Sequence, residues 1–252
     1  GSALTAGNYT FSVRVDDADV PADSDSRTFT LSIGAPVAET LLVSRTSSPV
    51  RVDGDFSETH WNLTSSAARQ LLGTPDNTTT FSVLWDADNL YLAARVADTR
   101  LSSAGMGAER DAIEFFLDAF NDKQAIFNSQ HRQFRVALDG ALFERGGRSS
   151  GVKQALLLVP GGYQLEMSIP WSNLGITPVA DQTVIGLDLA NDDSDTTAAR
   201  QHYSAFAFSD PADPRPSQFG NAILTNVAVS GTGGEPLGSV GAAPVAHEPF
   251  DY

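Results

Sequence analysis

The segment from residue 81 to residue 98 constrains the fold most, because apolar side chains occupy every second position in two consecutive runs. The first run is Phe81, Val83 and Trp85, and the second is Leu90, Leu92, Ala94 and Val96. This period-two alternation is typical of a strand with one buried face. Asp86-Ala-Asp-Asn89 lies between the runs and has the composition of a turn. The segment therefore predicts a β-hairpin packed against a core.

A third alternating run follows a Gly- and Ser-rich excursion. In Asp111–Asp118, Ile113, Phe115 and Leu117 fall on one face and Glu114, Phe116 and Asp118 on the other. Short runs separated by Gly, Pro, Asn and Asp turns continue to about residue 229, and the longest amphipathic helical pattern is Ser65–Leu72. We therefore predict an all-β fold, an antiparallel two-sheet β-sandwich of jelly-roll type over residues 40–229, with helix confined to a turn or two.

The two ends of the chain have different patterns. Residues 1–36 contain two alternating runs around an acidic loop, which predicts an N-terminal β-hairpin. Because two strands are marginal alone in water, two interpretations stay open. The runs resemble the last strands of an immunoglobulin-like extracellular repeat, or they are extra strands packed on the sandwich. Residues 230–252 are rich in Gly, Pro and Ala, which predicts a linker and the start of a following module.

Charge and composition limit the partners. The sequence has 16 basic and 31 acidic residues, a net charge of −15. That charge repels nucleic acid and anionic membrane and attracts divalent cations. There is no cysteine for disulfides, and no apolar run approaches the roughly 20 residues that span a bilayer. We expect a secreted or cell-surface protein of several domains, with neither a nucleic-acid partner nor membrane insertion.

The sequence gives little support for catalysis. A glycosidase needs two carboxylates across a cleft, and the available ones are Glu114, Asp118, Glu144 and Glu166. Glu114 and Glu166 alternate with apolar residues in strands, which favours solvated or calcium-facing positions. The chain has no cysteine nucleophile, and its histidines, His60, His131, His202 and His247, lie in unrelated contexts. We expect no enzyme, although the chain could be an accessory module of a secreted carbohydrate-active enzyme.

Several blocks of the sequence together resemble one family. Trp85-Asp-x-Asp-Asn-Leu-Tyr-Leu92 leads to Asp111-Ala-Ile-Glu-Phe-Phe-Leu-Asp118, as in the central strands of the family 9 carbohydrate-binding modules and similar domains. Other blocks follow the same order: Val52–Trp61, Gln133–Val136, Gly161–Trp171, Ile185–Asp193 and Phe219–Leu224. This resemblance implies a β-sandwich that binds sugar and carries structural calcium.

Two groups of aspartates are candidate calcium ligands, because hard carboxylate oxygens suit that ion. Asp192, Asp193 and Asp195 follow the strand predicted at Ile185–Ala190 and place three carboxylates on one turn. Asp98 and Asp111 flank the excursion between two strands, where an ion could pin the loop ends together. We expect structural Ca²⁺ among these five residues; a solvated acidic loop is the alternative for the first group.

Sugar binding needs an aromatic face together with polar groups for the hydroxyls. The family resemblance implies two tryptophans that sandwich a terminal sugar, but their positions fall at Ala108 and in the aromatic-free loop 209–218. The three tryptophans, Trp61, Trp85 and Trp171, are expected to be framework residues. Arg135 matches a family arginine that contacts sugar hydroxyls. We predict a sugar site at Arg135, Gln133 and Phe208.

These observations favour a noncatalytic, calcium-stabilised carbohydrate-binding module of a multidomain protein, with the tryptophan clamp missing. Its partners would be a polysaccharide or glycan and flanking domains of the same chain. The alternative is a structural or adhesive spacer of a cell-surface protein without sugar binding. A third interpretation comes from similar sandwiches that hold haem, for which Met106 and His131 would be the axial ligands.

Overall fold

The computed structural model describes residues 7–16, 24–33, 39–56, 61–196 and 199–228. The chain divides into two compact units, residues 1–38 and 39–252. In the first, β1 (Gly7–Asp16) and β2 (Ser24–Ile33) form the predicted antiparallel hairpin. Among the described strands they pair only with each other. Their interpretation as the end of an immunoglobulin-like repeat stays a prediction, and the predicted linker at 230–252 lies outside the described residues.

The regular elements described in the larger unit are nearly all strands, as predicted. They are β3 (Thr40–Arg45), β4 (Ser65–Ser66), β5 (Arg69–Leu72), β6 (Thr78–Trp85), β7 (Asn89–Ala97), β8 (Ala112–Asp118), β9 (His131–Ala137), β10 (Leu142–Glu144), β11 (Lys153–Val159), β12 (Gly162–Pro170), β13 (Val184–Asp193), β14 (His202–Ala205) and β15 (Gly220–Ala228). The described helices are α1 (Trp171–Leu174) and the 3₁₀ turns η1 (Gly107–Glu109) and η2 (Pro216–Gln218).

The short helical pattern at Ser65–Leu72 is wrong as a helix prediction. The segment forms β4 and β5 instead. β4 pairs with β6 through Ser65 opposite Phe81, and β5 pairs with β14. Pairing with neighbouring strands has therefore overridden the local pattern, as is common for short segments.

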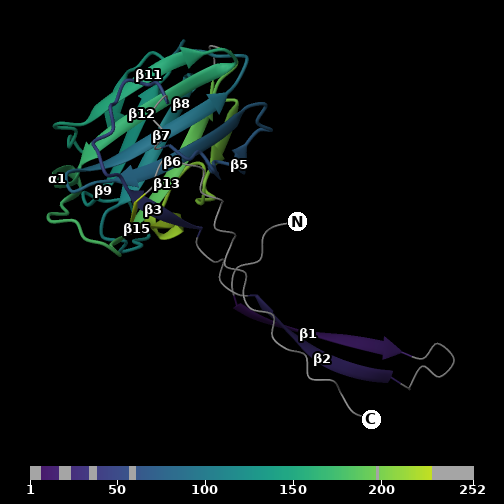
Figure 1. Cartoon of the computed structure of the whole chain (residues 1–252). Coiled ribbons are helices and arrows are strands. Elements are labelled where there is room, and N and C mark those ends of the chain that lie inside the picture. The colour runs from purple at the N-terminus through teal and green to yellow at the C-terminus, as the bar shows by residue number, and fades with distance from the viewer. Residues whose placement is uncertain (1–6, 17–23, 34–38, 57–60, 197–198, 229–252) are drawn as a thin grey trace. The chain divides into compact units, whose positions relative to one another are not determined.

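The strands pack in two layers, which confirms the sandwich (Figure 1). One layer has the order β11-β12-β7-β6 and the other β10-β9-β8-β13-β15, while β3 pairs with both β15 and β6 and joins them. The pairings are antiparallel with two exceptions, β15 with β3 and β3 with β6. The core between the layers holds the alternating residues of the sequence pattern, such as Leu92 of β7, Phe115 of β8 and Met167 of β12.

The tryptophans belong to the framework, as expected. Trp85 and Trp171 are each only 2% exposed. Their indole N–H groups donate to the backbone carbonyls of Thr225 (3.1 Å) and Asp86 (2.9 Å). Trp61 is half-buried and donates to Glu166 Oε1 at 2.7 Å. Since each indole N–H has a partner inside the protein, the rings pin loops to the sandwich.

The outer face of β8, β9, β13 and β14 carries the residues that alternate with the core. Part of this face is apolar, because Phe116, Phe208 and Phe219 pack there as a second cluster. The other part is charged and contains Glu114 and Arg135, which lie opposite each other in the β8–β9 register. This charged part positions the candidate site.

Candidate functional site

Arg135 lies at the centre of the charged outer face. Its side chain is 10% exposed, and its Nε donates to Asp192 Oδ2 at 2.9 Å. The same Nε is 3.5 Å from Glu114 Oε1, and Nη2 donates to the backbone carbonyl of Arg110 at 2.9 Å. A guanidinium held at two of its three nitrogens has a fixed orientation, and the third nitrogen adds further donors to this face.

A second arginine approaches the same carboxylates from β14's side. Arg200 Nε is 2.6 Å from Asp192 Oδ1, and the guanidinium carbon lies 3.9 Å from the centre of the Tyr203 ring. Burial raises the pKa of Glu114, and the adjacent Asp192 carboxylate raises it further, while Arg200 and Arg135 oppose both effects. Two arginines therefore compensate two buried carboxylates that would otherwise repel each other.

The other predicted sugar-binding residues have different environments. Gln133 is partly exposed, and its Nε2 donates to Glu114 Oε2 at 3.2 Å, where the Tyr203 hydroxyl also donates. Gln133 therefore adjoins Arg135 on the same face. Phe208 is 0% exposed and packs edge-on against Phe116 with ring centres 5.3 Å apart. Its prediction as a sugar platform is wrong, because a fully buried ring has no face to offer a ligand.

The structure brings together three of the five aspartates predicted as metal ligands. One carboxylate oxygen from each of Asp98, Asp111 and Asp193 lies within 4.8 Å of the others, and all three residues are buried. Burial raises the pKa of Asp111 to about 7 and that of Asp193 to about 6. Three buried acids that converge in this way concentrate negative charge, which a bound cation would compensate.

Among the described residues, the hydrogen bonds of this carboxylate cluster leave a buried oxygen of Asp193 without a partner. Asp111 accepts the backbone N–H groups of Ser102 and Ser194, each at 2.8 Å. Asp193 Oδ2 lies 2.9 Å from His202 Nδ1, whereas its buried Oδ1 has no hydrogen-bond partner among the described residues. An unpartnered buried oxygen within a set of hard oxygen donors fits the coordination chemistry of calcium.

The prediction of three carboxylates on one turn is wrong. β13 continues to Asp193 rather than ending at Ala190, so Asp192 and Asp193 are consecutive strand residues. Side chains of consecutive strand residues point to opposite faces. Asp192 therefore pairs with the arginines, while Asp193 joins the carboxylate cluster. Asp195 lies elsewhere, 2.9 Å from Arg100 Nη2.

A further group of Asp118, Asp122 and His131 has metal-ligand composition but is held by hydrogen bonds. The Asn128 backbone N–H donates to His131 Nδ1 at 2.9 Å, so the ring proton is on Nε2, which faces Asp122 Oδ1 at 3.2 Å. A metal would need the Nε2 lone pair. The haem interpretation also fails. His131 pairs with the last residue of β8, whereas Met106 precedes its first residue, so the two side chains lie at opposite ends of the strand and cannot bind one iron from both sides.

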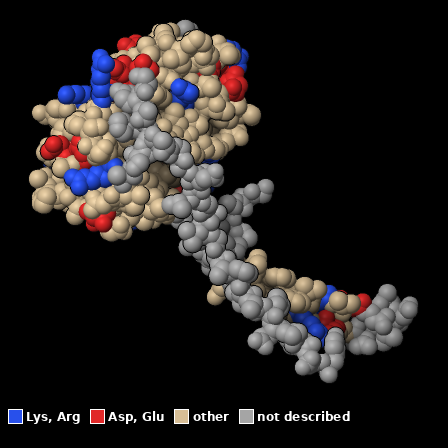
Figure 2. Space-filling model, in the orientation of Figure 1, with Lys and Arg blue, Asp and Glu red and all other residues tan. Residues whose placement is uncertain are grey.

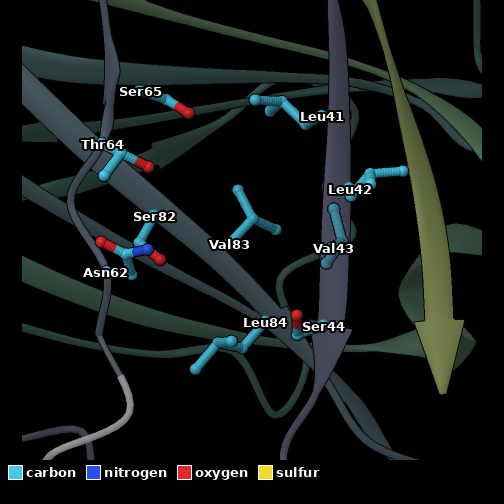
Figure 3. A pocket seen from close by; sticks show the side chains of 10 residues that line it. All are labelled: Leu41, Leu42, Val43, Ser44, Asn62, Thr64, Ser65, Ser82, Val83 and Leu84. Atoms are coloured by element: carbon cyan, nitrogen blue, oxygen red, sulfur yellow. The ribbon is translucent and has the colours of Figure 1, made fainter. Parts of the chain in front are cut away.

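The pocket in Figure 3 lies away from all these residues. It has a volume of about 120 Å³ and opens where β3 diverges from β6. The two strands pair through Ser44 and Arg45 of β3, at the end of that strand. Leu41 and Val43 of β3 face Thr64 and Ser65 across it, with Val83 between them (Figure 3). Neither a charged nor an aromatic side chain is among the described residues that line it. The pocket therefore offers no aromatic face on which a sugar ring could stack.

Two further observations concern the surface. Charged side chains on the visible face of the sandwich form small interspersed groups of both signs (Figure 2). The described residues contain no helix that is both long and apolar enough to cross a membrane.

The comparison with known families decides the assignment. Residues 51–227 match the model of the carbohydrate family 9 binding domain-like family. The chain belongs to this family. It is 32% identical over 181 residues to an exoglucanase, XynX, of Acetivibrio thermocellus, and these residues make up 69% of this chain but 16% of that protein. It is 31% identical over 212 residues to endo-1,4-beta-xylanase A of Thermotoga maritima, covering 80% of this chain and 19% of that protein. The chain thus spans under a fifth of either relative.

Solved structures of the family have the same fold. A family 9 carbohydrate-binding module from Caldicellulosiruptor kristjanssonii in complex with cellotriose superimposes with a TM-score of 0.65 and 25% identity, covering 74% of this chain and 94% of that one. Its complex with glucose gives the same TM-score and identity, with coverage of 76% and 98%.

Sequence reasoning missed Arg200 and Tyr203 as members of the charged face of this family 9 domain. The register Asp192 opposite Tyr203 brings them there, and it depends on β14 pairing with β13. No local pattern predicts that pairing. Glu114 was recognisable as an outer-face residue from its alternation, but its partners were not.

Proposed function

We propose that the sandwich is a noncatalytic carbohydrate-binding module that binds a neutral glycan at the outer face around Arg135. The observation that carries this proposal is the orientation of Arg135, whose guanidinium is fixed by Asp192 and Arg110 beside the acceptor groups of Glu114 and Gln133. Paired donors and acceptors of this kind match the vicinal hydroxyls of a sugar ring. Solved family neighbours bound to cellotriose and glucose support the ligand class.

The binding is expected to be weak. Loops 101–110 and 209–218 contain no aromatic residue, so two rings that would sandwich a sugar are missing. Each ring contact is worth about 0.5–1.5 kcal/mol beyond area burial. A dissociation constant on the order of 1 mM, equivalent to about −4 kcal/mol, is therefore the expected scale. A net charge of −15 also disfavours polyanionic glycans at a distance, unless a calcium ion bridges to a uronate.

Titration with cellotriose and xylotriose, followed by protein NMR, tests this proposal. The wild type should show saturable shifts in the millimolar range, and Arg135→Lys should abolish them, because lysine keeps the charge but lacks the planar fork. Arg51→Lys is the matched control, since Arg51 is 81% exposed and pairs only with Asp53 among the described residues. Thermal melts of both variants separate lost binding from lost folding. Absence of shifts in the wild type would favour the spacer function instead.

The proposal includes a structural calcium ion held by Asp98, Asp111 and Asp193. It is supported by the convergence of three buried carboxylates and by the free Oδ1 of Asp193. Bound there, calcium would neutralise the cluster. It would also anchor the loop that contains Arg110, whose carbonyl orients Arg135. Calcium in this position would therefore act on sugar binding through the loop and would not touch the sugar.

We also propose a secreted, extracellular setting in which the module serves a larger protein. Its relatives include xylanases and an exoglucanase, which supports an accessory role beside a catalytic domain. A pull-down of the wild type and of Arg135→Lys on insoluble xylan and cellulose tests whether the module localises such a protein on polysaccharide.

A further inference from the structure

Phe143 is an exposed aromatic ring directly beside the proposed sugar site. It lies in β10 and is 57% exposed, and the register pairs it with Arg135 of β9. Its neighbour Leu142 packs against the core between the layers. Because adjacent strand residues point to opposite faces, Phe143 projects from the outer face, on the same side as Arg135 and Glu114.

We propose that Phe143 is the platform on which a bound pyranose ring stacks, a role that rests on the proposed sugar-binding function. Residues directly opposite each other in antiparallel strands have Cβ atoms about 4.5–5.5 Å apart. One sugar ring can therefore lie on the phenyl face while its hydroxyls reach Arg135 and Gln133. The site then follows the row Phe143, Arg135, Glu114 across β10, β9 and β8.

The position of Phe143 distinguishes it from an ordinary exposed aromatic residue. Phe120 is similarly exposed, at 55%. It follows the last residue of β8, whereas Glu114 lies near the first. At about 3.3 Å per residue, it is separated from Glu114 by roughly 20 Å of strand and loop. At that separation Phe120 cannot share a sugar ring with Arg135 and Glu114, whose polar groups would fix its orientation. Phe143 combines an open ring face with such groups.

The stacked geometry also predicts a ligand preference. The ring faces of β-linked glucose and xylose units are lined with axial C–H groups, which pack on an aromatic face. A sugar with an axial hydroxyl on that face would lose part of the contact. Phe143 should therefore favour gluco- and xylo-configured units over galacto-configured ones.

Binding of cellotriose, measured by NMR titration with Phe143→Ala and the control Phe120→Ala, tests this inference. Phe143→Ala should weaken binding about 5- to 10-fold, the effect of losing one ring contact, and Phe120→Ala should stay within about twofold. Phe143→Trp should restore or strengthen binding and add a tryptophan whose fluorescence changes with ligand. Equal affinity in Phe143→Ala and wild type would overturn the platform role while leaving the sugar function intact. Lack of binding by the wild type would overturn both.

Discussion

Removing calcium should destabilise the sandwich through the cluster of Asp98, Asp111 and Asp193. The perturbation is a chelator in excess, compared with millimolar calcium, at pH 8, where the carboxyls that titrate at about 6 and about 7 are largely ionised. Asp193→Asn removes one ligand and one charge. Asp213→Asn removes a charge from an exposed residue with 55% side-chain exposure and is the matched control.

The magnitude follows from the geometry. The carboxylate oxygens of the cluster lie within 4.8 Å of one another, and two unit charges at that limit repel by about 3.5 kcal/mol at an effective dielectric constant of about 20. Three ionised acids give three such pairs, and at pH 8 the calcium-free protein retains this repulsion because Asp111 and Asp193 are largely deprotonated. Calcium at about one hundred times its dissociation constant adds about 2.7 kcal/mol of stability. For a domain of this size each kcal/mol moves Tm by about 2–4 °C, so chelation should lower Tm by roughly 5–11 °C.

Differential scanning calorimetry of the three proteins provides the assay. Wild type and Asp213→Asn should respond equally to calcium, and Asp193→Asn should lose most of the response. In chelator alone, Asp193→Asn should be at least as stable as wild type, because it relieves repulsion. Identical melting of wild type in chelator and in calcium would refute the calcium site, and an undiminished response in Asp193→Asn would place it elsewhere.

Three further predictions concern folding. Burial raises the pKa of Asp188 from 3.8 to about 7, so the folded state keeps a proton that the unfolded state releases. From this group alone, the free energy of unfolding should fall by up to about 4 kcal/mol as pH rises from about 4 to about 7. In calcium-free urea titrations, Asp188→Asn should lack that part of the pH dependence. The same pH dependence in Asp188→Asn and wild type would contradict the prediction. Glu166 accepts the backbone N–H groups of Asp53 and Gly54 and the indole N–H of Trp61. Glu166→Gln should therefore lower the free energy of unfolding in urea by about 1.5–3 kcal/mol. A decrease of less than about 0.5 kcal/mol would count against this role. Gly162 has φ +152°, and a Cβ there would lie 1.9 Å from the Val96 carbonyl oxygen. Gly162→Ala should lower the yield of folded protein, and a wild-type Tm would refute the clash.

Much of the fold could be predicted because its information is local. Period-two alternation in residues 81–98 and 111–118 decides which side chains enter the core, and the turn Asp86–Asn89 decides the hairpin. The parallel pairings of β3 could not be predicted, since they join segments distant in the sequence without a pattern of their own: Leu41 pairs with Ala222 of β15, and Ser44 with Leu84 of β6. β4 and β5 are similar cases, because two to four residues carry too little periodicity to indicate a strand.

The candidate site was predictable only in part. Asp98 and Asp111 were found because they flank one loop, and Arg135 because it lies in a recognisable block. Asp192 was misassigned because an acidic run at a strand end looks like a turn, although the pleat separates neighbouring residues. Phe143 was missed because β10 has three residues, and its relation to Arg135 follows from the register of two strands.

Mapping of cellotriose binding by NMR, with assigned backbone amides and titration into the calcium-loaded protein, tests the central claim most directly. The account predicts saturable shifts concentrated in β8, β9 and β10 around Glu114, Arg135 and Phe143, with little change around Leu41 and Val83 in the pocket between β3 and β6. Shifts confined to that pocket, or none at ligand concentrations of about 10 mM, would contradict it.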